Sequence, residues 1–467
     1  MSLAMRVPGW RSIRAHVERP HRSPAVPPAP RLPRVDEDAL AGGVMPWMAV
    51  DWSLLLVGFL AYVFITTTYY ISGGDYAMGA ALFGLILVRG PLRRPPLIAW
   101  MLVYCWWCVM GLAMTDYPTV VIERLRDFLK LWLIVVVAVN ALTTRAALRL
   151  FMVFFAGCFA LFPLRGAFVN FLGGDTLFGR ALWNHIFSNP NDLAAITLLQ
   201  LSMVAGMLSS GVRGWIRACC LAGAFLLPLL ILITQSRGAI IAMGVFAIAL
   251  LVEQRRRLRP RVILRLLAAA ALLAYVTPSS VWTRLGGVRR VTSTAQLDAV
   301  DPEGSARQRF EIWRVAARII REHRVLGVGL GAYKLEHLRV SRSAEFNPTA
   351  RGARDTHSTV LNVAAETGVV GLLLFLLLIG TAVRDAERVR RAGRTLLPAG
   401  ARQLLYLELG LLAYFVAGVW GSYAHLAFTY LHVALIVSAT AILRQELGLQ
   451  TQGGGAVARS PARATRA

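Results

Sequence analysis

The feature that most constrains this chain is a series of apolar runs, many of them close to 20 residues long, that recur along most of its length. An apolar helix of about 20 residues crosses the roughly 30 Å hydrocarbon layer of a bilayer. The chain is 56% hydrophobic and only 16% charged, whereas soluble globular proteins are less apolar and carry more charge. The sequence therefore predicts an all-α fold, namely a polytopic integral membrane helical bundle.

We expect about twelve transmembrane helices, with about ten to thirteen as the range because several runs are short or closely spaced. The expected spans lie near 50–71, 75–90, 96–115, 128–143, 147–170, 191–210, 215–234, 238–253, 262–278, 368–384, 403–422 and 426–443. A long polar interruption separates the ninth span from the tenth. The predicted organisation is a disordered basic tail at 1–45, about nine spans within 46–277, a large loop with helices of its own at 278–367, C-terminal transmembrane helices at 368–445 and a disordered tail at 446–467.

The arginines predict the orientation of the bundle. Short loops rich in arginine alternate with short loops such as 73–76 and 421–424, which contain none, and this alternation marks the arginine-rich loops as cytoplasmic. The exception is the stretch with Arg124 and Arg126, which this count places outside. Both termini are then cytoplasmic and the loop 278–367 lies outside. The formal net charge of +25 does not indicate nucleic-acid binding, because the arginines lie between spans rather than on one soluble face.

Neither a metal site nor a redox site is indicated. Cys105 and Cys108 have CxxC spacing inside an apolar run, where packing is the expected role because redox and metal sites need polar surroundings and further ligands. The histidines and carboxylates show no metal-ligand spacing. We expect no metal and no cofactor.

Arg237 is an unusual charge, since it is the only one between Arg217 and Glu253. An arginine at the centre of a span costs about 2.5–3.5 kcal/mol on insertion scales. One interpretation is a tight external hairpin whose arginine extends to the interface. The other is an anion site, because Gln235 and Ser236 add hydrogen-bonding groups beside a guanidinium that suits phosphate oxygens.

The segment from Ser305 to Arg324 predicts an amphipathic helix. Trp313, Ala316 and Ile320 share one face at about 100° per residue, and Arg309 lies on it in line with Trp313. Arg309 should therefore point into the protein, where it needs an anionic partner or substrate. The arginines of the opposite face are explained by solvent or lipid headgroups; they are Arg307, Arg314, Arg318 and Arg321.

Two further positions stand at predicted helix starts. Asn189 precedes Pro190 and Asp192, which is typical of a well-formed helix N-terminus. His357 stands where the long loop re-enters the membrane. A histidine at the start of a helix is more often a cap or a surface residue, but its position where the loop re-enters the membrane also suits a functional role.

In their order and spacing these pieces resemble the O-antigen ligase and polymerase family of bacterial membrane glycosyltransferases. The resemblance covers roughly 185–380, and its motifs are Asn189-Pro-Asn-Asp-Leu-Ala194, Ser236-Arg-Gly-Ala239, Arg309-Phe-Glu-Ile-Trp313, Gly327-Val-Gly-Leu-Gly-Ala-Tyr333, Asp355-Thr-His-Ser358, Ala365-Glu-Thr-Gly368 and Gly371-Leu-Leu. Members commonly have His-Asn where this chain has His357-Ser358. The resemblance implies a bundle in the bacterial inner membrane with a periplasmic catalytic loop, which would be 278–367.

The resemblance also implies a glycan donor on undecaprenyl pyrophosphate, used without a nucleotide sugar or a metal. It assigns Arg237 and Arg309 to the pyrophosphate and His357 to the role of base, with inversion at the anomeric carbon. The acceptor stays open between another lipid-linked glycan, lipid A–core and a protein hydroxyl. Further residues expected to bind substrate are Arg180, Asn189, Asn191, Arg307 and Glu366. The alternative is a polysaccharide or lipid exporter that makes no glycosidic bond.

Overall fold

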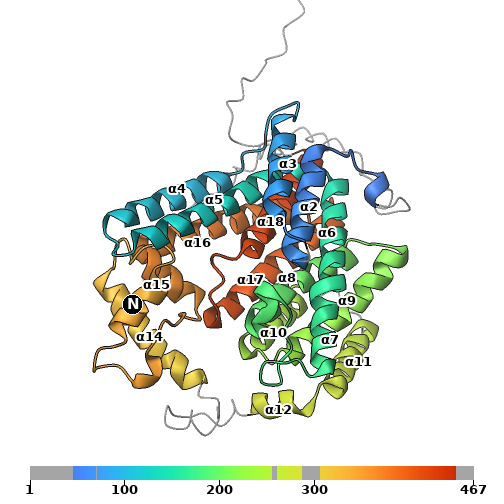
Figure 1. The fold of residues 1–467 in the computed structure, drawn as a ribbon. Coiled ribbons are helices and arrows are strands. Elements are labelled where there is room, and N and C mark those ends of the chain that lie inside the picture. Colours follow the sequence, from blue (N-terminus) through green and yellow to red (C-terminus); the bar gives the residue numbers. More distant parts are fainter. Residues whose placement is uncertain (1–45, 70, 255–259, 287–304, 449–467) are drawn as a thin grey trace, which may run out of the picture. The chain divides into compact units, whose positions relative to one another are not determined.

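The structure is a computed structural model, and it describes residues 46–69, 71–254, 260–286 and 305–448. The predicted tails at 1–45 and 446–467 lie outside these residues, except for 446–448. All regular elements of the described residues are helical, as the apolar runs predict (Figure 1). The α-helices are α2 (Leu54–Thr68), α3 (Gly74–Ile86), α4 (Pro96–Met110), α5 (Pro118–Ala141), α6 (Arg145–Phe159), α7 (Arg165–Gly173), α8 (Pro190–Ser209), α9 (Gly214–Ile233), α10 (Arg237–Gln254), α11 (Pro260–Val276), α12 (Ser279–Gly286), α14 (Ser305–Glu322), α15 (Tyr333–Val340), α16 (Thr359–Gly393), α17 (Pro398–Ala417) and α18 (Ala427–Glu446).

A helix occurs at each of the twelve predicted spans. In the described part of the chain, eight helices are long and apolar enough to cross a membrane. In this count α4 continues to Ala113, and α6 and α7 form one helix from Arg145 to Gly173. Four others fall short: α2, α3 and α11 have 15, 13 and 17 residues, and α5 carries charged side chains along its first half. The all-helical membrane fold is therefore confirmed, while the count of about twelve spans stays a prediction.

The helix that follows the long loop is longer than the sequence indicates. The predicted span covers 368–384, but α16 runs from Thr359 to Gly393. Gly368 interrupts it with φ 71° and ψ 179°, so that two helical stretches meet there at a kink. Arg388, Arg390 and Arg391, which lie beyond the end of the predicted span, therefore stand on the last turns of this helix.

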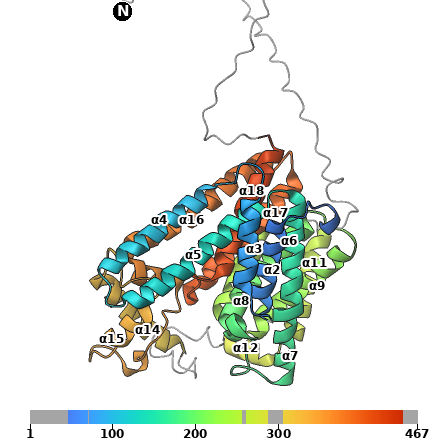
Figure 2. The same ribbon diagram turned by 45° about the horizontal axis from the view of Figure 1, so that its top comes forward.

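Contacts between distant helices form the core. α17 packs against α8 and α10, and α16 packs against α4, α17 and α18 (Figures 1 and 2). Large side chains such as Tyr104, Tyr414 and Phe375 are fully or almost fully buried between them. Cys105 and Cys108 are buried in α4 as free thiols, which agrees with a packing role.

Helices α14 and α15 belong to the segment between α11 and α16, and they pack on each other and on α16. The turn between them, at Gly327–Gly331, lies against the start of α16. The amides of Val328 and Gly329 donate to the carbonyl oxygens of Ala365 and Glu366 at 2.9 and 3.0 Å. These bonds fix α14 and α15 against one end of the bundle, which we call the site end because it carries His357.

Candidate functional site at the site end of the bundle

His357 lies in a turn just before α16 and has a left-handed backbone, with φ 47°. Few residues other than glycine adopt this conformation, which occurs often at functional sites. Its backbone amide donates to Oδ1 of Asp355 at 3.1 Å, and this short-range bond supports the turn. The helix itself begins two residues later, at Thr359. The cap interpretation therefore fails for the His357 side chain, since the N-cap position belongs to Ser358.

Asp355 anchors this turn to two other parts of the chain. Ser422, in the loop between α17 and α18, donates a hydrogen bond to Asp355, and Lys334 Nζ on α15 lies 3.4 Å from its Oδ2. Burial alone would raise the pKa of the Asp355 carboxyl. The bonds from Ser422 and the His357 amide, with the charge of Lys334, outweigh burial and hold that pKa below its ordinary value. Asp355 is therefore an anion at neutral pH.

The His357 imidazole is surrounded mainly by cations. Burial lowers its pKa below the ordinary value of 6.5, and the nearby charges of Arg309, Lys334 and Arg354 lower it further, against the opposing effect of Asp355. The ring is therefore neutral at pH 7. A neutral imidazole accepts a proton, and the cations beside it attract an anion.

Helix α14 places Arg309 near this ring. The face of α14 that is buried carries Ile312, Val315 and Ile319, and Arg309 at its edge is partly buried. The indole nitrogen of Trp313 donates to the carbonyl oxygen of Thr356 at 2.9 Å. The predicted common direction of Arg309 and Trp313 is thus present in the structure.

The arginines on the other side of α14 have ordinary partners. Arg314 pairs with Glu311 at 3.0 Å, and Arg318 pairs with Glu345 at 3.0 Å. Arg307, expected to bind substrate, is exposed. The charge of Arg309 acts on His357 and lowers the pKa of its ring.

A second group of polar residues forms where α8 begins. Arg180 donates from Nε to the carbonyl oxygen of Thr234 at 2.8 Å and from Nη2 to Asn191 Oδ1 at 2.7 Å. Asn189 Oδ1 accepts from the Asn191 amide at 2.9 Å, so Asn189 is the N-cap of α8. Arg180 and Asn191 therefore hold the N-terminus of α8 against the end of α9.

The loop at 421–423 joins this group to His357. Tyr423 donates from its hydroxyl to the carbonyl oxygen of Asn191 at 3.2 Å, and its amide donates to Thr359 Oγ1 at 3.0 Å. Burial raises the pKa of the Tyr423 hydroxyl well above its ordinary value, while Arg309 and Arg180 both act on it in the opposite direction. Both arginines therefore lie near the same buried tyrosine.

Arg237 opens α10 at the same end of the bundle. The connection from α9 is a tight hairpin, as one interpretation predicts, with Gln235 at φ 51°. Gln235 is buried, however, and its Nε2 donates to the carbonyl oxygen of Gly179 at 2.9 Å. Gly238 lies against Trp420, where an added Cβ would be 3.1 Å from the ring. Arg237 thus stands between the Arg180 group and the 421–423 loop.

Glu366 lies apart from His357. It is buried about two turns into α16, where Asn362 Nδ2 donates to its Oε1 at 3.1 Å and His425 Nε2 lies 3.2 Å from its Oε2. It comes nine residues after His357, and the helical rise of about 1.5 Å per residue places it farther into the bundle. Glu366 lies beneath the turn at Gly327, and this position suits a role in supporting that turn.

The sequence did not single out Lys334, Ser422 or Tyr423. Lys334 carried one signal, because it is one of two lysines in a chain rich in arginine. Ser422 and Tyr423 carried none, since they stand in a short loop 67 residues or more from Asp355. In the described residues, no group of three or more His, Cys, Asp or Glu side chains could hold a metal ion.

The fold and this group of residues define a polytopic helical membrane protein with a cation-lined polar site at one end of its bundle. Residues 222–376 match the Wzy_C family model, described as O-antigen ligase, and this supports assignment of the chain to the O-antigen ligase/polymerase family. No curated protein matches the chain. The family implies a bacterial integral membrane enzyme that transfers glycosyl groups. The matched segment contains Arg237, Arg309 and His357, whereas Arg180 and Ser422 lie outside it.

Proposed function

We propose that this protein transfers a glycan from a donor linked to undecaprenyl pyrophosphate to an acceptor hydroxyl, at the periplasmic face of the inner membrane. The family match supports the reaction class. The observation that carries the proposal is the neutral His357 ring among Arg309, Lys334 and Arg354, outside the spanning helices. The arginine-rich short loops at the opposite end support the orientation, with both termini cytoplasmic.

The proposed step is a direct displacement. The acceptor oxygen attacks the anomeric carbon and forms a new C–O bond on the face opposite the pyrophosphate. The bond from the anomeric carbon to the phosphate oxygen breaks, and the pyrophosphate leaves with the electron pair. This path inverts the anomeric centre.

The residues have two tasks in this step: some stabilise the charge of the leaving group, and one removes the proton of the acceptor. Arg309 and Lys334 stabilise the charge that develops on the pyrophosphate, and Arg237 is the third cation proposed to contact it. His357 takes the proton of the acceptor hydroxyl as general base. The phosphate charge is balanced by guanidinium and ammonium groups, and for this reason we propose a metal-independent reaction.

We give Arg180 and Asn191 a supporting part in this proposal. Their hydrogen bonds hold α8 and the α9–α10 hairpin together beside Arg237. Glu366 and Asn189 act likewise through the turn and the helix start that they stabilise. The acceptor, whether a lipid-linked glycan, lipid A–core or a protein hydroxyl, decides between polymerase and ligase activity.

The test uses purified full-length protein with an undecaprenyl-pyrophosphate-linked glycan and an acceptor, in a single-turnover assay. His357→Asn is the informative variant, because asparagine tolerates the left-handed backbone of this position and has no imidazole. We expect transfer to fall about 10²–10⁴-fold, the usual contribution of a positioned general base, with donor binding retained.

His323→Ala is the control, since His323 lies in the same segment and its ring faces Glu336 at 3.8 Å rather than Asp355. It should transfer at nearly the wild-type rate. Wild-type transfer by His357→Asn would remove His357 from the chemistry. If the glycan crosses the vesicle membrane and no new glycosidic bond forms, the protein is an exporter and the transferase proposal is refuted.

A further inference from the structure

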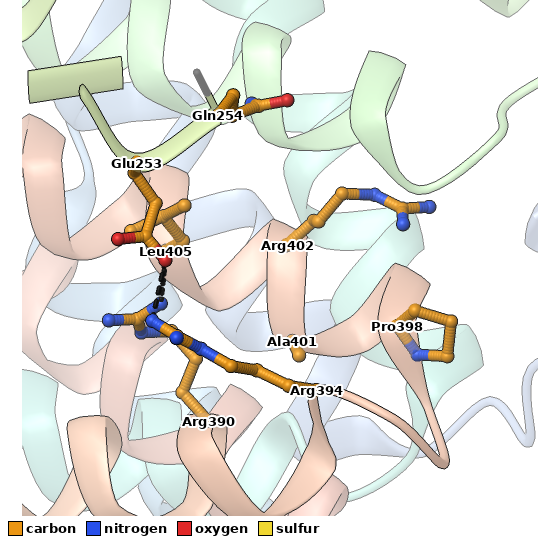
Figure 3. A pocket seen from close by; sticks show the side chains of 8 residues that line it. All are labelled: Glu253, Gln254, Arg390, Arg394, Pro398, Ala401, Arg402 and Leu405. Carbon is orange, nitrogen blue, oxygen red and sulfur yellow. Dashed lines mark hydrogen bonds and ion pairs between the residues drawn. The ribbon is translucent and has the colours of Figure 1, made fainter. Parts of the chain in front are cut away.

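A pocket of about 280 Å³ opens at the end of the bundle opposite His357, where α10 and α16 end and α17 begins (Figure 3). The rest of α16, a helix of 35 residues, separates it from the proposed glycan site. The glycan-transfer proposal gives this pocket no role. It is lined by Glu253, Gln254, Arg390, Arg394, Pro398, Ala401, Arg402 and Leu405.

One wall of the pocket is an ion-pair network around Arg390. The Arg390 side chain is only 8% exposed and lies 3.3 Å from Glu253 and 2.9 Å from Glu408, with Glu387 also in contact. A buried guanidinium needs such partners. Glu253 is shared, because it also pairs with Arg394 at 2.5 Å. This carboxylate therefore serves two arginines of the pocket.

The other wall carries Arg402 on α17. Its Nε and Nη2 both donate to the carbonyl oxygen of Ser209 at 3.2 Å. A carbonyl accepts hydrogen bonds but does not neutralise a charge, and among the described residues no carboxylate pairs with Arg402. Figure 3 shows its guanidinium directed away from the network of Arg390 and Glu253. The pocket lining thus has three arginines and one carboxylate.

The remaining wall is apolar, formed by Pro398, Ala401 and Leu405. The ends of the helices in a membrane bundle lie at the level of the lipid headgroups. A lipid at this level presents a charged headgroup and apolar acyl chains. Basic pockets between transmembrane helices on the cytoplasmic side suit anionic lipid headgroups. We propose that this pocket binds the phosphodiester headgroup of an anionic phospholipid from the adjacent leaflet, with Arg402 and Arg394 as its phosphate contacts.

The proposal is tested by native mass spectrometry of the full-length protein in detergent, with phosphatidylglycerol as the probe and phosphatidylcholine as the uncharged comparison. Arg402→Gln should weaken phosphatidylglycerol binding about tenfold, because a hydrogen bond to a charged group contributes at least about that factor. Arg402→Lys keeps the charge without the planar fork and should lose less. Arg391→Gln is the matched control: Arg391 is 71% exposed, pairs with Glu387 and lies outside the lining.

Each alternative gives a different result. Equal losses in Arg402→Gln and Arg391→Gln would mean general surface attraction and would overturn the site. Equal binding of phosphatidylcholine would overturn the headgroup assignment. Displacement of the lipid by inorganic phosphate at similar concentrations would identify a free-anion site instead. Thermal unfolding of each variant verifies its fold, and Arg394→Gln provides a second test if Arg402→Gln does not fold.

Discussion

Replacing Gly327 with alanine should detach the turn that holds α14 and α15 in place. Gly327 has φ 71°, and an added Cβ would lie 2.3 Å from the carbonyl carbon of Glu366. That atom belongs to the backbone of α16, so no side-chain rotation relieves the clash. The turn must instead move away from α16.

The magnitude follows from what the movement breaks. A non-glycine residue in the left-handed conformation costs about 1–2 kcal/mol. Separation also breaks the bonds from the Val328 and Gly329 amides to α16, each worth about 0.5–1.5 kcal/mol. Gly327→Ala should therefore lower the free energy of unfolding by about 2–5 kcal/mol. Transfer should fall as well, because Arg309 and Lys334 stand on the two helices that the turn joins.

Gly380→Ala, within α16 itself, is the control. No atom lies within 4 Å of the Cβ it would add, and alanine in a helix interior is favoured over glycine by roughly 0.5–1 kcal/mol. Denaturant unfolding in detergent micelles and the transfer assay are run on both variants. If Gly327→Ala unfolds and transfers as Gly380→Ala does, the turn does not position the site.

Two further predictions concern the cations. Arg309→Ala should reduce transfer far more than Arg318→Ala at equal membrane abundance, because Arg318 pairs with carboxylates on the exposed side; equal losses would refute the directional argument. Lys334→Met should move the acid limb of the pH–rate profile to higher pH. Burial and nearby cations, Lys334 among them, lower the pKa of His357. Removing one cation therefore raises the pKa of His357, and the neutral base is lost at a higher pH as the solution is acidified. An unmoved acid limb would mean that His357 does not set it.

The structural features that follow from local or periodic sequence patterns were predictable. Period 3.6 placed Arg309 with Trp313 on one face of a helix predicted at Ser305–Arg324, and α14 spans Ser305–Glu322. Asn189 before Pro190 predicted the start of α8, which the structure confirms. Local patterns of this kind depend on a few neighbouring residues, so the chain itself contains the information.

Contacts between distant segments were not predictable. Asp355 and Ser422 are 67 residues apart, and their hydrogen bond depends on how α16 and α17 pack. Lys334 approaches Asp355 only because the Gly-rich turn sets the course of α15. Glu366 shows the opposite case. It is close to His357 in the sequence, but its side chain lies next to His425 instead, because of its position in α16.

The hydrogen bonds of Ser422 and Arg180 have a consequence for exchanging parts between relatives. The segment matched by the family model, 222–376, contains the residues proposed for the chemistry, but Ser422 fixes Asp355 from beyond its C-terminal limit and Arg180 holds Thr234 from before its N-terminal limit. A chimaera that exchanges only 222–376 would therefore inherit the reacting groups without the residues that align them. The smallest transferable unit of this protein runs from about Arg180 through Tyr423, so grafts should be cut outside those positions.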